Sequence, residues 1–145
     1  MSARPKLKIL FLCSGNSVRS QMAEGFTRDL KGDLIEVYSA GIEARGLHPL
    51  AVQVMHEVGV DISGQKSKTA DQLPDFDFDY LITVCDDARE SCPLFLRAAQ
   101  SVHAAFADPA QAVGTEDEIL AIFREVRDRI RAFVQQMPGN LPARA

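Results

Sequence analysis

The sequence lacks the features typical of membrane, nucleic-acid-binding and disulfide-stabilised proteins. No segment approaches the ~18 consecutive apolar residues that a membrane helix requires. Acidic residues outnumber basic ones by 20 to 16, so the basic excess of a nucleic-acid-binding or anionic-membrane surface is missing. Three cysteines, an odd number, do not make a disulfide framework. We therefore expect a cytoplasmic protein that binds neither nucleic acid nor membrane.

Signatures of common metal and nucleotide sites are missing as well. No Cys-x-x-Cys motif and no histidine pair at zinc-finger spacing is present, which argues against zinc. Residues 59–66 come nearest to a Walker loop, but Gln65 interrupts that pattern. We expect no bound cofactor and no resident metal, and the cysteines are then free or catalytic thiols.

Apolar runs alternate with amphipathic stretches along the chain. Apolar runs predict strands, and apolar residues at helical spacing predict helices. The predicted strands cover residues 7–12, 34–39, 79–85 and 101–107, and the predicted helices cover residues 20–30, 49–58 and 115–136. This alternation predicts one α/β domain over residues 1–145, built on a small four-stranded parallel sheet with helices on both faces.

Three chemically capable side chains lie at or just after the ends of predicted strands. Cys13 follows the first strand, Cys85 ends the third and Asp108 follows the fourth. Ligand sites in open parallel sheets lie at the carboxyl ends of the strands. We therefore expect these three residues to share one site.

The run from Cys13 to Ser20 has the composition of an oxyanion-binding loop with a nucleophile. Glycine and asparagine suit a tight turn whose N–H groups converge on an anion, and the following helix adds positive potential. Arg19 supplies a bidentate cation, and the same field stabilises a thiolate on Cys13, to which Ser20 and Ser17 could donate hydrogen bonds. The plainer alternative is a buried thiol at a strand end. The residues expected to bind the oxyanion are Ser14, Gly15, Asn16, Ser17, Val18 and Arg19.

With this loop, the chain resembles the low-molecular-weight tyrosine phosphatase family and, within it, the thioredoxin-coupled arsenate reductases. Ser39-Ala40-Gly41 and the general-acid motif Asp108-Pro109 extend the resemblance over nearly the whole chain. Cys85 and Cys92, seven positions apart, match the additional cysteine pair of the reductases. Family phosphatases usually carry an aromatic residue after Asp-Pro, where this chain has Ala110.

The resemblance implies a reductase that converts arsenate to arsenite with electrons from thioredoxin. Cys13 would attack arsenic, assisted by Ser20, while Arg19 holds the oxyanion and Asp108 protonates the departing oxygen. Cys85 would then attack Cys13, and Cys92 would attack Cys85. Thioredoxin would reduce the resulting disulfide, so the expected partners are thioredoxin and a small oxyanion.

This relay makes a demand on the chain between the second and third cysteines. A disulfide needs Cα atoms about 4.4–6.8 Å apart. If residues 86–91 are helical, Cys85 and Cys92 lie roughly 10 Å apart along the axis. We therefore expect residues 86–98 to be mobile and to change shape on oxidation.

Some of these reductases hold a potassium ion near the loop, and the resemblance extends to that site. Asn16, Glu24 and Ser39 match ligand positions, whereas Lys68 replaces a fourth, acidic ligand. We expect the Lys68 ammonium to take the place of the cation and to pair with Glu24.

Two other functions stay open at this point. One is a phosphatase that hydrolyses phosphotyrosine or small phosphoesters and protects Cys13 through a reversible disulfide. The other is a non-catalytic redox sensor that binds an oxyanion. A monomer is expected in each case.

Overall fold

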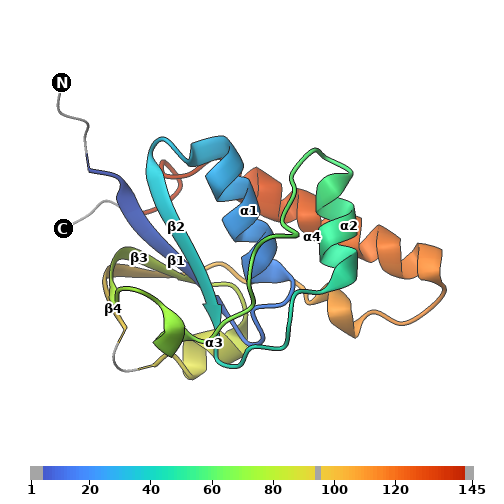
Figure 1. Cartoon of the computed structure of the whole chain (residues 1–145), viewed down its shortest axis with the longest axis horizontal. Helices are drawn as coiled ribbons and strands as arrows, with labels where there is room; N and C mark the ends of the chain where they lie inside the picture. Colours follow the sequence, from blue (N-terminus) through green and yellow to red (C-terminus); the bar gives the residue numbers. More distant parts are fainter. Residues whose placement is uncertain (1–4, 94–95, 143–145) are drawn as a thin grey trace.

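The structure, a computed structural model, describes residues 5–93 and 96–142 and contains a four-stranded parallel sheet (Figure 1). The strands lie in the order β2-β1-β3-β4, and all three neighbouring pairs are parallel. Their bounds are β1 Leu7–Cys13, β2 Ile35–Gly41, β3 Asp77–Thr83 and β4 Arg97–His103. The sheet predicted from the sequence is confirmed.

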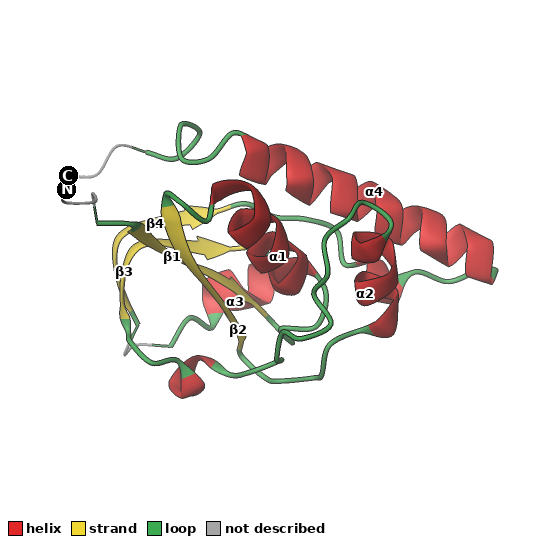
Figure 2. Ribbon diagram, turned by 45° about the horizontal axis from the view of Figure 1, so that its top comes forward, coloured by secondary structure: helices red, strands yellow, loops and turns green. Residues whose placement is uncertain are grey.

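Helices lie on both faces of this sheet. Figure 2 shows α1 in front of the strands and α3 behind them. Helix α1 contacts β1, β2 and α4, while α2 packs against α4. The bounds are α1 Arg19–Lys31, α2 Pro49–His56, α3 Asp86–Glu90 and α4 Glu116–Gln135. Among the helices of the described ranges, none is long and apolar enough to cross a membrane.

The strands differ because β1 is central and β4 is at an edge. Ile9 to Leu12 of β1 are fully buried, which explains why that run is continuously apolar. The fourth strand was predicted at residues 101–107, but β4 begins four residues earlier, at Arg97, and ends at His103. Because β4 pairs only with β3, its small and polar residues alternate between partly buried and exposed and give a weak apolar pattern.

Two details of the helix faces do not follow the simple rule that apolar residues are buried and charged residues exposed. Leu30 of α1 and Ile122 of α4 are apolar, yet they are 40% and 37% exposed. Arg127 of α4 is charged, yet it is buried, and its guanidinium donates to Val54 O at 3.0 Å and Glu57 Oε1 at 2.9 Å. These acceptors belong to the end of α2 and the residue after it, so no local pattern around Arg127 reveals them.

The segment after Cys85 is a short helix, α3. The Cys85 Sγ accepts a hydrogen bond from Ala88 N at 3.4 Å, and Asp86 and Asp87 occupy the first turn, where acidic side chains are favoured. Five helical residues span about 7.5 Å, so this helix separates Cys85 from Cys92. Residues 94 and 95, part of the segment predicted to be mobile, lie outside the described residues.

Candidate functional site

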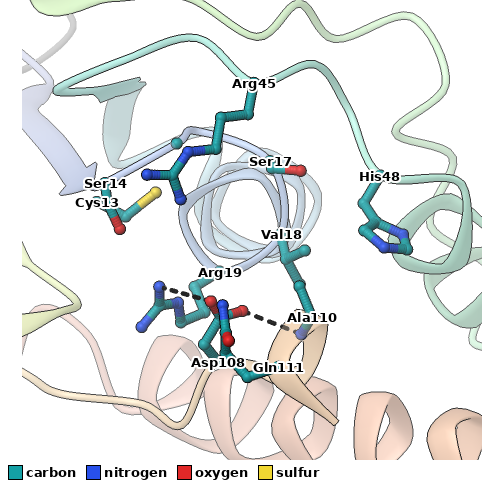
Figure 3. A pocket seen from close by; sticks show the side chains of 11 residues that line it. Cys13, Ser14, Ser17, Val18, Arg19, Arg45, His48, Asp108, Ala110 and Gln111 are labelled. Carbon is teal, nitrogen blue, oxygen red and sulfur yellow. Dashed lines mark hydrogen bonds and ion pairs between the residues drawn. The ribbon is translucent and has the colours of Figure 1, made fainter. Parts of the chain in front are cut away.

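The loop between β1 and α1 lines a cavity of about 310 Å³ at the carboxyl end of the sheet (Figure 3). The residues around the cavity come from this loop, from the segment after β2 and from the segment after β4. They are Cys13, Ser14, Gly15, Ser17, Val18, Arg19, Arg45, His48, Asp108, Ala110 and Gln111. The predicted oxyanion-binding residues therefore surround one space, except Asn16, whose side chain points into the protein.

Asn16 holds the loop together from inside. It adopts a left-handed conformation with φ 47°, and it is fully buried. Its Nδ2 donates to Ser20 Oγ at 2.8 Å and Ser39 Oγ at 3.0 Å. Its Oδ1 accepts from Lys68 N and from Gln21 Nε2, both at 2.9 Å. These four bonds fix the orientation of the amide group.

The orientation of the Asn16 amide decides where the Ser20 proton points. Ser20 Oγ accepts from Asn16 and lies 2.8 Å from Cys13 Sγ, so its own proton is free to point at the sulfur. Asn16 N also donates to Cys13 Sγ, at 3.1 Å. Two groups that can donate hydrogen bonds, Ser20 Oγ and Asn16 N, therefore face the Cys13 sulfur.

Arg19 and Asp108 lie together on another side of the cavity. Arg19 Nη1 donates to Phe106 O at 3.2 Å, and Nη2 lies 3.5 Å from Asp108 Oδ2. The other Asp108 oxygen, Oδ1, accepts from Ala110 N at 3.0 Å (Figure 3). These contacts hold a carboxyl group and a guanidinium beside the Cys13 thiol, where they can act on the same anion.

The second cysteine lies next to the loop and the third does not. Ser14 Oγ is 3.5 Å from Cys85 Sγ, so the residue after the nucleophile touches the Cys85 thiol. Cys85 is buried, whereas Cys92 is half-buried beyond α3 and lines a different cavity with Thr83 and His103. Burial raises the pKa of the Cys92 thiol. The structure therefore brings Cys13 and Cys85 together and leaves Cys92 to one side.

The network behind the loop ends at Glu24. Glu24 Oε1 accepts from Ser39 Oγ at 2.6 Å and lies 3.6 Å from Lys68 Nζ. Its Oε2 pairs with Arg28 Nη2 at 2.7 Å. Two cationic side chains thus already face this buried carboxylate, and a potassium ion would add a third positive charge. The residues present do not fit such an ion.

The Ser39-Ala40-Gly41 motif has a steric explanation. A Cβ atom on Gly41 would lie 2.7 Å from Asn16 N and 2.2 Å from Glu43 O. Both distances are shorter than real contacts allow, so only glycine lets the end of β2 approach the loop this closely. Ser39, two residues earlier, then reaches Asn16.

Comparisons with known proteins agree with this geometry. The family model for the low molecular weight phosphotyrosine protein phosphatases matches residues 8–143. The chain belongs to this family. An arsenate reductase from Halalkalibacterium halodurans is 50% identical over 125 residues, which cover 86% of this chain and 90% of that protein.

Solved structures of family members extend the likeness. An arsenate reductase in its phosphate-binding state is 34% identical with a TM-score of 0.78, covering 94% of this chain and 99% of that one. A thioredoxin-dependent arsenate reductase from Corynebacterium glutamicum is 32% identical with a TM-score of 0.59. That match covers 91% of this chain and 62% of the other.

The sequence analysis did not predict three polar residues that belong to this site. Gln21 is buried and its Nε2 donates to Asn16 O at 3.1 Å, and its position directly after Ser20 is the sequence signal that could have identified it. Arg45 and His48 line the cavity but lie far from the loop in sequence. No local pattern marks them, because backbone pairing between the loop and residues 42–48 brings them there.

Proposed function

We propose that this protein reduces arsenate to arsenite and that thioredoxin supplies the electrons. The observation that supports this function most strongly is the position of the three thiols, each farther than the last from the loop proposed to bind the oxyanion. Cys13 lies in the loop, Cys85 touches it through Ser14, and Cys92 lies beyond a short helix. The names of the 50% identical relative and of the Corynebacterium structure support the proposal.

In the first step, the Cys13 thiolate attacks the arsenic of arsenate. The loop N–H groups and Arg19 hold the remaining oxygens and balance the developing charge. Asp108 donates a proton to the departing oxygen, which leaves as water. The product is a covalent adduct between the Cys13 sulfur and pentavalent arsenic.

Cys85 resolves this adduct. Its sulfur attacks the Cys13 sulfur, and the electron pair of the sulfur–arsenic bond passes to arsenic, which leaves as trivalent arsenite. A Cys13–Cys85 disulfide remains. The Cys92 thiolate then attacks Cys85 and releases the Cys13 thiolate, and thioredoxin reduces the Cys85–Cys92 disulfide with two electrons.

The relay has two consequences for where and how the protein works. It needs a compartment in which thiols stay reduced, so we infer that the protein is cytoplasmic. It also uses the cysteines of one chain only, so a monomer suffices.

A coupled assay tests this function. We expect arsenate-dependent NADPH consumption when the protein is mixed with thioredoxin and thioredoxin reductase. Cys85→Ser should stop this consumption, while Ser63→Ala, a change at an exposed residue after α2, should not. Arsenate that binds without any NADPH consumption would contradict the proposal and favour an oxyanion sensor.

Phosphatase activity is the second candidate, and the pairing of Arg19 with Asp108 favours it. A cationic oxyanion site beside a carboxyl group also suits hydrolysis of a phosphate monoester. Aryl phosphate turnover that persists in Cys85→Ser while arsenate turnover is never seen would support this function. Loss of aryl phosphate turnover in that variant would not fit a phosphatase.

We further propose that Lys68 provides the cation of the network behind the loop. Its ammonium lies 3.6 Å from Glu24 Oε1 and can neutralise that carboxylate without a bound ion. Activity should therefore be equal in potassium and sodium chloride at one ionic strength, and Lys68→Ala should make it rise with potassium. A strong potassium dependence of the unaltered protein would contradict this role.

A further inference from the structure

The segment that follows β2 is attached along the oxyanion loop by backbone hydrogen bonds. Glu43 N donates to Ser14 O at 2.8 Å, and Arg45 N donates to Gly15 O at 2.9 Å. His48 N donates to Ser17 O at 3.1 Å. The position of Arg45 beside the loop is therefore set by the main chain and does not depend on its own side-chain contacts.

Gly15 gives the Arg45 side chain room to cross the loop. A Cβ atom on Gly15 would lie 2.7 Å from Arg45 Cδ and 3.0 Å from its Cγ. The aliphatic stem of Arg45 thus lies directly over the glycine. Figure 3 shows its guanidinium reaching the cavity on the side of Cys13 opposite to Arg19.

The present partner of Arg45 is a weak one. Its Nε pairs with Glu43 Oε2 at 3.0 Å, and the two side chains are 52% and 64% exposed. Exposed pairs of this kind contribute little free energy, because water screens both charges. The pKa of Arg45 is raised chiefly by Glu43, with smaller contributions from the charges of Asp108 and Cys13. The Arg45 guanidinium therefore interacts electrostatically with two groups that line the cavity, Asp108 and Cys13.

We propose that Arg45 is a substrate-selecting residue, which binds the outward-facing oxygen of a small tetrahedral dianion and excludes the organic group of a phosphate monoester. The proposal rests on the proposed function of the cavity and deepens it. The loop and Arg19 hold the three inner oxygens, and Arg45 leaves Glu43 to pair with the one oxygen that points outward, the oxygen that departs in the proposed reaction. A monoester would place its ester oxygen and organic group in the space that the guanidinium needs.

Calorimetric binding of two ligands tests this role. Inorganic phosphate represents the free dianion, and phenylphosphonate represents an aryl monoester that cannot be hydrolysed. In Arg45→Ala, we expect phosphate to bind about tenfold more weakly, since one charge-assisted contact is lost. Phenylphosphonate should bind as before or more tightly. The KM for arsenate should rise by the same factor, with kcat within about twofold.

Matched variants separate Arg45 from general effects of charge. Arg45→Lys keeps the charge without the planar fork and should lose only part of the phosphate affinity. Glu43→Gln removes the competing carboxylate and should tighten phosphate binding. Arg124→Ala removes another exposed arginine that pairs with a carboxylate, Glu57, outside the cavity, and should change neither ligand.

The outcomes also distinguish this inference from the proposed function. Unchanged phosphate affinity in Arg45→Ala, or an equal loss for both ligands, would overturn the role of Arg45 alone. An equal loss in Arg124→Ala would overturn it as well, because net charge would then govern binding. Failure of the unaltered protein to bind phosphate at all would overturn the oxyanion site and this inference together.

Discussion

The oxyanion loop and the α3 segment hold their cysteines in very different ways. Beside Cys13, Asn16 and Ser20 are fully buried, and hydrogen bonds tie them to α1 and to the end of β2. Beyond Cys85, most side chains of α3 are exposed, and Ala88 is its only buried residue. His103 joins α3 to β4, because its Nε2 lies within hydrogen-bond distance of Asp86 Oδ1, at 2.9 Å.

This difference matches two chemical tasks. A nucleophile, the role proposed for Cys13, works best in a field that does not rearrange during attack, and a loop tied by buried hydrogen bonds suits it. The proposed disulfide relay would need a segment that can move until two sulfurs meet, and the mostly exposed segment between Cys85 and Cys92 suits that task. In the proposed cycle, the protein therefore combines a fixed site with a movable thiol.

Cys92→Ser should have the largest effect, because it removes the thiol proposed to form the second disulfide and leaves the loop intact. Arsenite should form once, in an amount equal to the enzyme, and turnover should then stop with a Cys13–Cys85 disulfide in place. Quenched-flow arsenite assays and mass spectrometry of the trapped protein measure both quantities. Continued turnover in this variant would mean that thioredoxin reduces the first disulfide directly.

Asn16→Ala should destabilise the loop that carries Cys13. Loss of its buried hydrogen bonds and the strain of alanine at φ 47° should lower the free energy of unfolding by roughly 3–5 kcal/mol. Asn16→Gly, which tolerates that φ, should recover about 1 kcal/mol of the loss without restoring activity. Urea denaturation measures these differences, and equal stability of all three proteins would contradict the part assigned to Asn16.

The rate at which Cys92 attacks the Cys13–Cys85 disulfide should depend on pH. Because burial raises the pKa of Cys92, this thiol stays protonated through neutral pH and its thiolate fraction grows as the pH rises. The conversion of the Cys13–Cys85 form into the Cys85–Cys92 form should accelerate about tenfold per pH unit above neutrality, until the raised pKa is passed. Acid quenching at a series of pH values follows this step. A rate that does not change between pH 7 and 8.5 would show that deprotonation of Cys92 does not limit it.

His103→Gln should give the smallest effect, because it changes one side-chain contact at the surface. The His103 ring lies between Thr83 Oγ1 at 2.7 Å and Asp86 Oδ1 at 2.9 Å and ties β4 to the first residue of α3. Amide hydrogen exchange in α3 should become about two- to fivefold faster, as expected for a pair worth a few tenths of a kcal/mol to 1 kcal/mol. Arg129→Gln, which breaks another surface pair, serves as the control and should leave α3 unchanged. Equal exchange in all three proteins would mean that His103 does not restrain the segment.

The shape change of residues 86–98 on oxidation stays a prediction. Helix α3 strengthens the reason for it, since a helix between Cys85 and Cys92 must distort before they can bond. Comparing hydrogen exchange in the reduced and Cys85–Cys92-oxidised forms would test it directly.

Much of the fold was predictable because its central elements carry strong local patterns. The apolar run of β1 and the helical spacing of apolar residues in α4 identified these two elements from sequence alone. The edge strand β4 was displaced by four residues because an edge needs no continuous apolar run. The burial of Arg127 could not be predicted, because its partners Val54 and Glu57 are about 70 positions away in sequence.

The sequence by itself determined the chemistry: an oxyanion loop with a cysteine and an arginine, an Asp-Pro motif and two further thiols. Local composition suffices for this, because such a loop needs particular residue types at adjacent positions. Only the tertiary structure decided that the Asn16 amide leaves the Ser20 proton free to point at Cys13 and that Arg45 reaches the cavity. Those contacts join segments distant in sequence, and the packing of β2 and the chain after it against the loop creates them.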